Sequence, residues 1–438
     1  MDALPLIFFA TILLLLMTGY PVAFTLGGAS LIFGLFTFGI EFFNLLPLRI
    51  WGVMNNYILI AVPLFIFMGV MFEKSGLAED LLETMALLFG KLRGGLAISV
   101  LIVGAMLAAA TGIVGATVVT MGLLSLPVML NKGYDPKVAT GIIAASGTLG
   151  QIIPPSIILV LLGSVLNISV GNLFIGAVIP GFLIVILYLL WIILIAFVKP
   201  ESAPAMPQSD LDLFVGKDKI KRIITAFAAP FFLILAVLGS IFAGIASPTE
   251  AAALGAMGAT VLTVIRNKLT INTLKDVMVK TMTLTSMAFM ILVGASAFGL
   301  VFRGMGGDTY LTNLITSSSL EPHHFLAIVM LIIFVAGFFI DFIEIIFIIV
   351  PVVAPIFVHL NINLLWVGIL IAVNLQTSFL TPPFGFSLFY LKGVAPEEVT
   401  TTQIYKGIIP FVVIQMIGLL LIILFPEIAL WLPAIMGN

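Results

Sequence analysis

The sequence predicts an all-α polytopic membrane protein built from two inverted-topology repeats, with two re-entrant helical hairpins and two broken helices. Composition is the first observation behind this prediction, because 62% of the 438 residues are hydrophobic and only 9% are charged. Soluble domains carry about 25% charged residues, so an ordinary cytosolic enzyme is excluded. An internal duplication and the uneven distribution of lysine and arginine are the other two observations.

Apolar segments recur along the whole chain, at 4–17, 21–39, 59–72, 95–130, 138–165, 172–198, 224–243, 249–265, 283–302, 325–358, 364–391 and 408–425. A helix needs roughly 20 apolar residues to cross a bilayer. The first segment is expected to be a retained helix, because it lacks the basic start and small-residue cleavage site of a signal peptide. Segments 95–130 and 325–358 are too long for one crossing and too short for two, which predicts re-entrant hairpins.

Prolines indicate an internal duplication. Three landmarks recur at nearly one offset: Pro21 as Pro248 after 227 residues, and Pro127 as Pro355 and Pro154-Pro155 as Pro382-Pro383 after 228. We therefore expect a first repeat over 1–198 and a second repeat over 224–438, with broken helices at 138–165 and 364–391. The polar stretch 199–223 between the repeats is expected to be a cytoplasmic linker.

Lysine and arginine predict the orientation, because they concentrate in cytoplasmic loops. With the two long segments as hairpins, each half crosses the membrane an odd number of times, so the halves are inverted. With the N-terminus outside, sixteen of the 18 basic residues fall inside, and only Arg49 and Arg303 fall outside. A single crossing at either long segment would invert everything after it and remove this bias. Both termini are therefore predicted to be periplasmic.

The two broken helices carry candidate ligands for a hard cation. Prolines end normal helical hydrogen bonding, which frees carbonyl oxygens one turn earlier, and sodium prefers oxygen ligands. The first break offers Ser146, Gly147 and Thr148, and the second offers Asn374, Gln376, Thr377, Ser378 and Thr381. A proline kink whose serine and threonine hydroxyls bond back to the helix is the alternative. Polar side chains at membrane depth mark an ion or substrate path, which favours function for the second break.

The hairpin turns are expected to supply the other half of each site. The first turn, 109–117, contains Thr111 and Gly112 among small residues that let backbone approach a ligand closely. The second turn, 339–345, contains Asp341 and Glu344, the two acids of a long apolar stretch. A carboxylate at the bilayer centre costs about 3 kcal/mol, so these acids have a function or a partner such as Arg303.

Other motifs exclude whole classes of protein. There is no cysteine, no Walker-type phosphate loop and no nucleophile elbow, so no catalytic machinery is visible and the chain is not expected to be an enzyme. The 18 basic residues give no footprint for nucleic acid. Glu250 belongs to a capping box with Ser247 and needs no functional explanation. Inverted repeats with interrupted helices are typical of secondary transporters, with a channel or a membrane scaffold as the alternative.

Several long motifs resemble the large membrane subunit of tripartite ATP-independent periplasmic (TRAP) transporters. They are Arg93-Gly-Gly-Leu, Gly133-Tyr, Gly147-Thr-Leu-Gly with Ile153-Pro-Pro-Ser156, Leu173-Phe with Ile179-Pro-Gly181, Gly244-Ile-Ala-Ser-Pro-Thr-Glu-Ala-Ala-Ala253 and Asn374-Leu-Gln-Thr-Ser-Phe-Leu-Thr-Pro-Pro-Phe-Gly-Phe386. The resemblance covers nearly the whole chain. It implies an inner-membrane permease that uses a sodium gradient to import organic acids by an elevator movement. It also implies two partners, a periplasmic substrate-binding protein and a small four-helix membrane subunit, which is expected to be a second polypeptide.

The resemblance also implies site residues. A first sodium site would join the 111–117 turn to Ser146–Thr148, and a second would join the 341–344 turn to Gln376–Thr381. Apart from the resemblance, Asn374, Asp341 and Arg303 are candidates for substrate binding or coupling because they are polar or charged side chains in or beside apolar segments, with interfacial anchoring as the alternative for Arg303. No cofactor is expected, and sodium ions are the coupling ions that the resemblance implies. The chain departs from the family pattern at Thr111-Gly-Ile-Val114 and at Gln151. A stand-alone sodium- or proton-coupled anion symporter is the alternative within transport.

Overall fold

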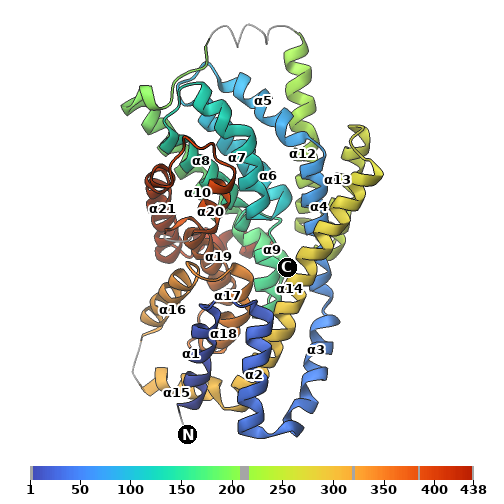
Figure 1. The fold of residues 1–438 in the computed structure, drawn as a ribbon, viewed down its shortest axis with the longest axis vertical. Coiled ribbons are helices and arrows are strands. Elements are labelled where there is room, and N and C mark those ends of the chain that lie inside the picture. The colour runs from blue at the N-terminus through green and yellow to red at the C-terminus, as the bar shows by residue number, and fades with distance from the viewer. Residues whose placement is uncertain (1–2, 208–216, 318–320, 383–384, 437–438) are drawn as a thin grey trace.

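The computed structural model describes residues 3–207, 217–317, 321–382 and 385–436, and all regular elements in these ranges are helices (Figure 1). Within this described part, six helices are long and apolar enough to cross a membrane: Tyr57–Lys74, Val114–Asn131, Val170–Val198, Pro248–Ile265, Ile271–Gly304 and Thr401–Leu424. Several shorter apolar helices, of 10–17 residues, accompany them. The prediction of an all-α, multi-pass chain is confirmed.

The first half folds into ten α-helices in the described residues. They are α1 (Leu4–Leu16), α2 (Val22–Phe38), α3 (Leu46–Met54), α4 (Ala61–Lys74), α5 (Leu77–Phe89), α6 (Gly95–Thr111), α7 (Val114–Asn131), α8 (Pro136–Thr148), α9 (Ile157–Leu166) and α10 (Val170–Val198). Short 3-10 turns lie at Ile40–Leu45, Tyr57–Ile60, Leu149–Gln151 and Pro200–Ser202. The break between α8 and α9 coincides with the proline pair, which confirms the first interruption.

The second half contains α12 (Lys217–Phe242), α13 (Pro248–Ile265), α14 (Ile271–Gly304), α15 (Gly307–Ser317), α16 (Pro322–Ala336), α17 (Phe342–Ile348), α18 (Val350–His359), α19 (Leu364–Leu380), α20 (Phe386–Val394), α21 (Thr401–Leu424) and α22 (Glu427–Met436). Helix α12 already begins at Lys217, so the linker predicted over 199–223 ends too late. Residues 208–216 of that linker lie outside the described ranges. Pro383 of the second proline pair also lies outside them, while α19 ends just before that pair, at Leu380.

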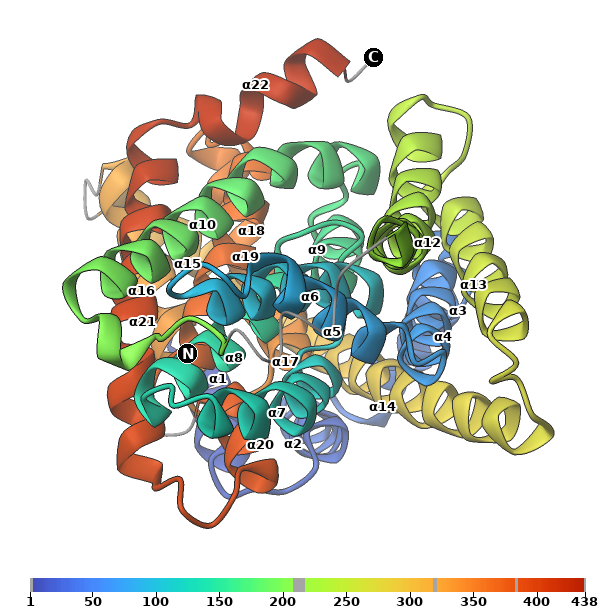
Figure 2. The ribbon, with the colours of Figure 1, turned by 90° about the horizontal axis from the view of Figure 1, so that it is seen from above.

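Helix pairings repeat between the two halves. Helix α2 packs along α14, and its counterpart α13 packs along α4; likewise α8 packs along α21, and its counterpart α19 packs along α10. Helices of each half therefore pack against helices of the other half. Helices α2–α4 and α12–α14 pack on one another and are called the scaffold here, while α6–α9 and α16–α20 are called the hairpin domain. In Figure 2, α3, α4, α12 and α13 of the scaffold lie together on the right.

Both long apolar segments turn back on themselves. Helices α6 and α7 pack against each other and are joined by Gly112 and Ile113 alone. Gly112 has a φ of +62°, a left-handed conformation that side chains disfavour and glycine accepts. In the second segment the rings of Phe325 in α16 and Phe357 in α18 lie 5.1 Å apart, so its beginning and end are neighbours.

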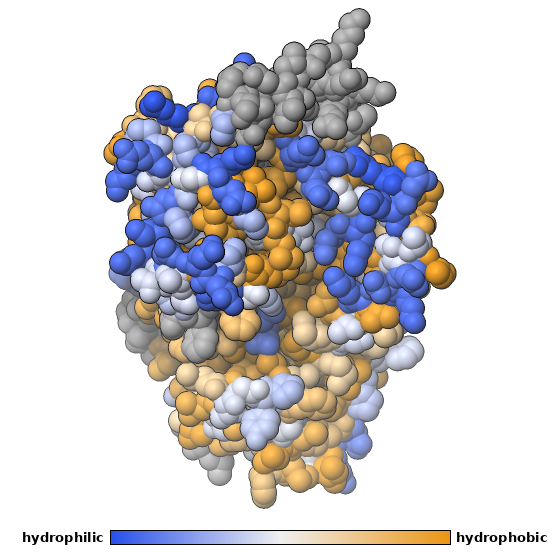
Figure 3. Space-filling view, turned by 45° about the horizontal axis from the view of Figure 1, so that its top comes forward, coloured by the Kyte–Doolittle hydropathy of each residue, from blue (hydrophilic) through white to orange (hydrophobic). Residues whose placement is uncertain are grey.

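The surface matches a membrane environment. Hydrophilic side chains gather over the upper end of the molecule, while hydrophobic side chains are exposed between and below them (Figure 3). Phe36 and Phe197, for example, are 86% and 81% exposed. Such surface is costly in water and favourable in lipid. The N-terminus lies at the opposite end of the long axis from α5 and the start of α12 (Figure 1).

Candidate functional site

The two hairpin turns meet at one cavity of about 530 Å³ against the scaffold. The first turn contributes residues 112–116, and the second contributes 341–343. Helices α4 and α14 form the facing wall, and Tyr390 of α20 closes one side. Gly112 and Asp341 are thus the predicted site residues that line this cavity. Mostly apolar walls with a few polar groups are typical of a small-molecule site.

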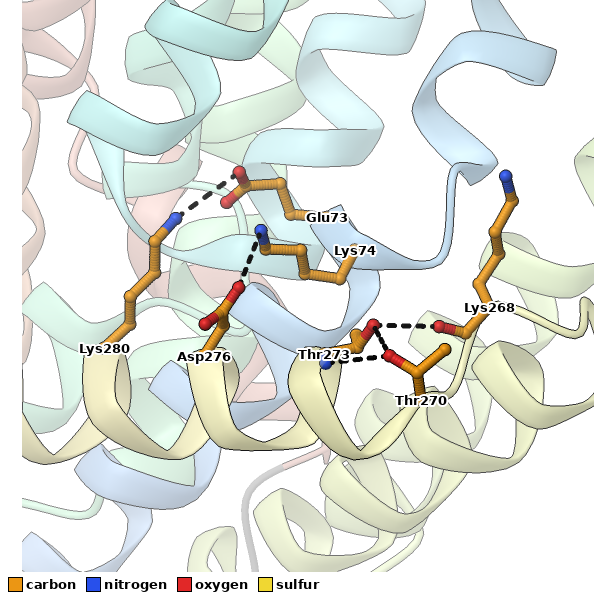
Figure 4. A network of polar contacts seen from close by, with 7 residues as sticks. All are labelled: Glu73, Lys74, Lys268, Thr270, Thr273, Asp276 and Lys280. Carbon is orange, nitrogen blue, oxygen red and sulfur yellow. Dashed lines mark hydrogen bonds and ion pairs between the residues drawn. The ribbon is translucent and has the colours of Figure 1, made fainter.

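The scaffold wall of the cavity carries two ion pairs that the sequence analysis missed. Lys280 Nζ lies 3.8 Å from Glu73 Oε1, and Lys74 Nζ lies 3.8 Å from Asp276 Oδ2 (Figure 4). Both pairs join α4 to α14, and Glu73 and Lys280 line the cavity itself. The spacing of Asp276 and Lys280, one helical turn apart, was a readable signal for one charged face.

Asp341 and Glu344 form a capping box at the start of α17. The Asp341 carboxylate accepts a hydrogen bond of 2.7 Å from the Phe342 amide, and Glu344 Oε2 accepts one of 3.0 Å from the Asp341 amide. These acids therefore find partners in backbone donors. Arg303 lines a different cavity, so the alternative of an Asp341–Arg303 pair is wrong. The Asp-x-x-Glu pattern before an apolar run was the overlooked sequence signal.

The first broken helix packs against both helices of the first hairpin. The Thr111 and Thr117 hydroxyl oxygens are 2.7 Å apart within the first hairpin. Gly104 of α6 contacts Ser146, and Val118 of α7 contacts Gly147. These contacts place the first broken helix against α6 and α7, the two helices of the first hairpin.

The hydroxyls of the breaks bond back to their own helices. Ser146 donates to the Ile143 carbonyl at 3.2 Å, and Thr148 donates to the Ala145 carbonyl at 2.9 Å. Ser378 and Thr381 likewise donate to carbonyls three and four residues earlier, both at 2.8 Å. This is the geometry of the kink alternative. Since each donated hydrogen leaves the oxygen lone pairs available, the same geometry also suits cation coordination.

Thr377 has a different surrounding from its neighbours. Its hydroxyl lies 3.0 Å from Gln415 Oε1, and Gln415 Nε2 donates to the Tyr188 hydroxyl at 2.8 Å. This network joins α19, α21 and α10 inside the protein, and all its side chains are buried. Thr377 therefore has structural partners away from the cavity between the turns.

Two buried amide side chains in the breaks have polar atoms without a hydrogen-bond partner among the described residues. Gln376 Nε2 donates weakly to the Thr148 hydroxyl at 3.4 Å, whereas its Oε1 has no donor. Both side-chain polar atoms of Gln151 are also unpartnered, and that residue is 1% exposed. A buried oxygen without a donor costs about 1–3 kcal/mol, which a bound cation would offset. No group of three or more acidic or histidine side chains able to hold a metal occurs in the described ranges. The ligands that the two breaks themselves offer are neutral oxygens.

Two further predicted residues lie away from the turns. Asn374 Nδ2 donates to the Met330 carbonyl of α16 at 2.7 Å, which makes it a tie inside the hairpin domain. Arg303 lines a separate cavity of about 630 Å³, and Arg49 lines the same cavity. Asn56 and Ser164 lie in its wall, with their side chains 2.9 Å apart. The two basic residues expected outside the membrane therefore share one space.

Residues 9–428 match the family model described as the tripartite ATP-independent periplasmic transporter, DctM component. The chain belongs to the DctM family. It is 29% identical to the C4-dicarboxylate TRAP transporter large permease protein DctM of Vibrio cholerae, over 98% of this chain and 97% of that protein. It is 30% identical to the protein of that name from Rhodobacter capsulatus, over 99% of each. These relatives of the DctM-family chain are named as permease subunits, and none of these names describes an enzyme.

The fold of this DctM-family chain is also found in a solved structure. The Alcanivorax borkumensis YdaH transporter superposes with a TM-score of 0.61 at 13% sequence identity, covering 97% of this chain and 98% of that one. At this identity the similarity concerns the fold alone.

Proposed function

We propose that the chain is the permease subunit of a sodium-driven importer of organic acids in the bacterial inner membrane. A periplasmic binding protein delivers the acid, and a small four-helix membrane subunit packs against the scaffold. The hairpin domain carries the acid across by an elevator movement along the scaffold. The family description, which names one component of a tripartite transporter, supports both partners. The dicarboxylate named for the relatives supports the substrate class.

The cavity between the two turns carries this proposal. It lies where the hairpin domain meets α4 and α14, so a bound acid would contact both bodies. Lys280 is the basic side chain lining it in the described part of the chain, while Glu73 and Asp341 supply two carboxyl groups. One ammonium beside two carboxylates leaves no positive charge for an anionic substrate. Sodium bound next to the turns would supply that charge, which gives coupling a physical reason.

The breaks supply a place for sodium. We assign its ligands to oxygens near the two turns, with Ser146, Thr148, Gln376, Ser378 and Thr381 as the side chains involved. Gln376 Oε1 is the strongest candidate because it is buried and accepts no hydrogen bond from a described residue. Neutral oxygens of this kind suit a hard monovalent cation.

We assign the two cavities to the two end positions of the substrate during the proposed elevator movement. Lys280 lines the first cavity and Arg303 the second, and both residues belong to α14. At about 1.5 Å per residue, roughly 35 Å of helix separate them. We assign the Arg49–Arg303 cavity to the periplasmic entrance, where a guanidinium can bind a carboxylate in bidentate fashion.

Uptake by proteoliposomes tests the proposal. The chain is reconstituted with the small subunit, with and without the binding protein, and uptake of a radiolabelled C4-dicarboxylate is followed under a sodium gradient or a pH gradient. Uptake that requires both sodium and the binding protein is expected. Uptake without the binding protein would favour the stand-alone symporter. Uptake driven by the pH gradient alone would replace sodium by protons and make Asp341 and Glu344 the carriers. No uptake under any condition would favour a scaffold.

A further inference from the structure

A basic pocket lies between the start of α8, which belongs to the hairpin domain, and helices α10 and α21 beside it, far from the turns. Its volume is about 300 Å³, and it is bounded by the start of α8, the end of α10 and the first turns of α21. Each of these elements contributes one lysine: Lys137, Lys199 and Lys406. Asp135 is the acidic residue in the lining, so the pocket carries a net positive charge.

The charged groups of the pocket are arranged to leave the lysines available. The Asp135 carboxylate caps α8 by accepting a hydrogen bond of 2.9 Å from the Lys137 amide. Among the described residues, no carboxylate oxygen lies within 4 Å of any of the three lysine ammonium groups. Three ammonium groups around one concave space attract an anion with more than one charged oxygen.

The walls below the lysines are apolar and exposed on the surface of the protein. Leu194 and Val198 of α10 line the pocket and are 51% and 67% exposed. Trp191, one turn further into the membrane, also lines it, and its indole nitrogen is buried without a hydrogen-bond partner among the described residues. An apolar flank, a buried N–H donor and a cluster of lysines at the rim together match the profile of a phospholipid, with acyl chains below and a phosphate above.

We propose that this pocket binds the headgroup of an anionic phospholipid, with phosphatidylglycerol as the probe of that class. The lysines contact the phosphate, and the acyl chains lie along α10. The pocket lies at the end of the molecule where basic residues concentrate, and basic pockets between membrane helices on the cytoplasmic side bind such headgroups. This inference does not depend on the proposed substrate or on sodium.

The bound lipid would join α8 of the hairpin domain to α10 and α21, which lie outside that domain. Gly407 of α21 contacts the Lys137 backbone of α8, so the two helices touch directly beneath the lysines. Helix α8 leads into the first break, while α21 packs along it and α10 closes the third side. A phosphate held by all three elements would keep this end of the first broken helix in place.

Fluorescence quenching of the full chain in nanodiscs tests the proposal. Brominated phosphatidylglycerol is compared with brominated phosphatidylcholine, and a Trp191→Phe variant is measured in parallel, so that the difference reports Trp191 alone. Each lysine near an anionic headgroup contributes about 1 kcal/mol, or roughly fivefold in affinity. We expect Trp191 to be quenched at more than tenfold lower mole fraction of the brominated phosphatidylglycerol. Equal quenching by both lipids would overturn the proposal.

A matched pair of variants separates the pocket from the general surface charge. We expect the preference for phosphatidylglycerol over phosphatidylcholine to be lost in the triple variant Lys137→Gln/Lys199→Gln/Lys406→Gln. The control removes the same charge from exposed positions elsewhere, in Lys91→Gln/Lys268→Gln/Lys275→Gln, and we expect it to keep the preference. Soluble glycerol phosphate is the last arm of the test. If it displaces the brominated lipid as effectively as unlabelled phosphatidylglycerol does, the pocket is a site for free phosphate and the lipid assignment fails. If the triple variant does not fold, the lipid comparison in the wild type still decides the question.

Discussion

The Thr148 hydroxyl and the Gln376 amide lie 3.4 Å apart, and the two residues are 228 positions apart in the chain. That spacing is the offset at which the prolines of the two halves repeat, so Thr148 and Gln376 are equivalent residues of the two repeats. Tyr188 and Gln415, separated by 227 positions, also contact each other, at 2.8 Å. Equivalent residues meet only where a two-fold axis passes between them. The two repeats are therefore joined along such an axis by two polar contacts, one of them between the broken helices.

Replacing Gln376 by leucine should weaken sodium dependence without weakening the fold. The side chain is fully buried and its Oε1 accepts no hydrogen bond from the described residues, so an apolar replacement of similar size removes an unsatisfied group. We expect an unchanged or higher midpoint of thermal unfolding and at least a tenfold higher sodium concentration for half-maximal uptake. Thr377→Val is the control, because its hydroxyl serves the network with Gln415. An unchanged sodium requirement in the leucine variant would remove Gln376 from the site.

Replacing Ser146 or Thr148 by alanine should also raise the sodium concentration needed for half-maximal uptake. Their hydroxyl oxygens lie at the end of α8 beside the first hairpin. If both broken helices bind sodium, the wild type should show a Hill coefficient above one and each single variant a value closer to one. Equilibrium binding of sodium, measured by calorimetry, checks the same point without transport. A coefficient of one in the wild type would reduce the two sites to a single site.

Replacing Gly69 by alanine should obstruct movement between the two bodies. A Cβ atom at Gly69 would lie 2.5 Å from the Cα and carbonyl oxygen of Thr111, which is backbone and has little room to shift. Helix α4 therefore approaches the first turn as closely as glycine permits. Overpacking of this kind costs about 1–3 kcal/mol. We expect uptake to fall at least tenfold in reconstituted vesicles while sodium binding is retained. Gly52→Ala, where nothing lies within 4 Å, is the matched control.

Removing the Tyr188 hydroxyl should destabilise the junction of the two repeats. In Tyr188→Phe the buried Gln415 amide loses its acceptor, which costs about 1–3 kcal/mol. Denaturant or thermal unfolding measures this loss, with Tyr57→Phe as control because Tyr57 is 80% exposed. In a double-mutant cycle with Gln415→Leu, we expect the double variant to lose less unfolding free energy than the two single variants lose together. Full additivity would show that the contact contributes nothing.

Replacing Arg303 by alanine should raise the substrate concentration needed for half-maximal uptake and leave the sodium requirement unchanged. Arg303 and Arg49 line one cavity, so the double variant should be affected more than either single one. Arg303→Lys should recover part of the affinity, because an ammonium keeps the charge but not the bidentate geometry. Normal uptake by a normally expressed Arg303→Ala protein would assign both arginines to interfacial anchoring instead.

Much of the fold was predictable because the bilayer restricts what a sequence can do. Apolar helices must satisfy their own backbone, so the membrane segments, the proline breaks at α8–α9 and the end of α19 followed from residue types alone. The linker was less predictable, since a polar composition does not distinguish a loop from the exposed start of α12 at Lys217. The orientation of both termini stays a prediction. Because the chain has no cysteine, single cysteines at Ala3 and Ala434 would report it through accessibility to a charged thiol reagent.

The sequence by itself determined which residue types occupy the turns and breaks, since each break follows from proline and each turn from glycine or a capping acid. The tertiary structure decided which of those residues meet. Lys280 reaches the cavity because α14 crosses beside α4, and Asn374 and Thr377 are held by Met330 and Gln415 from distant helices. Contacts of this kind depend on how helices far apart in the chain pack, and no local pattern encodes that packing. The partner of a buried polar group is therefore a property of the assembled helices, whereas the need for a partner is a property of the residue.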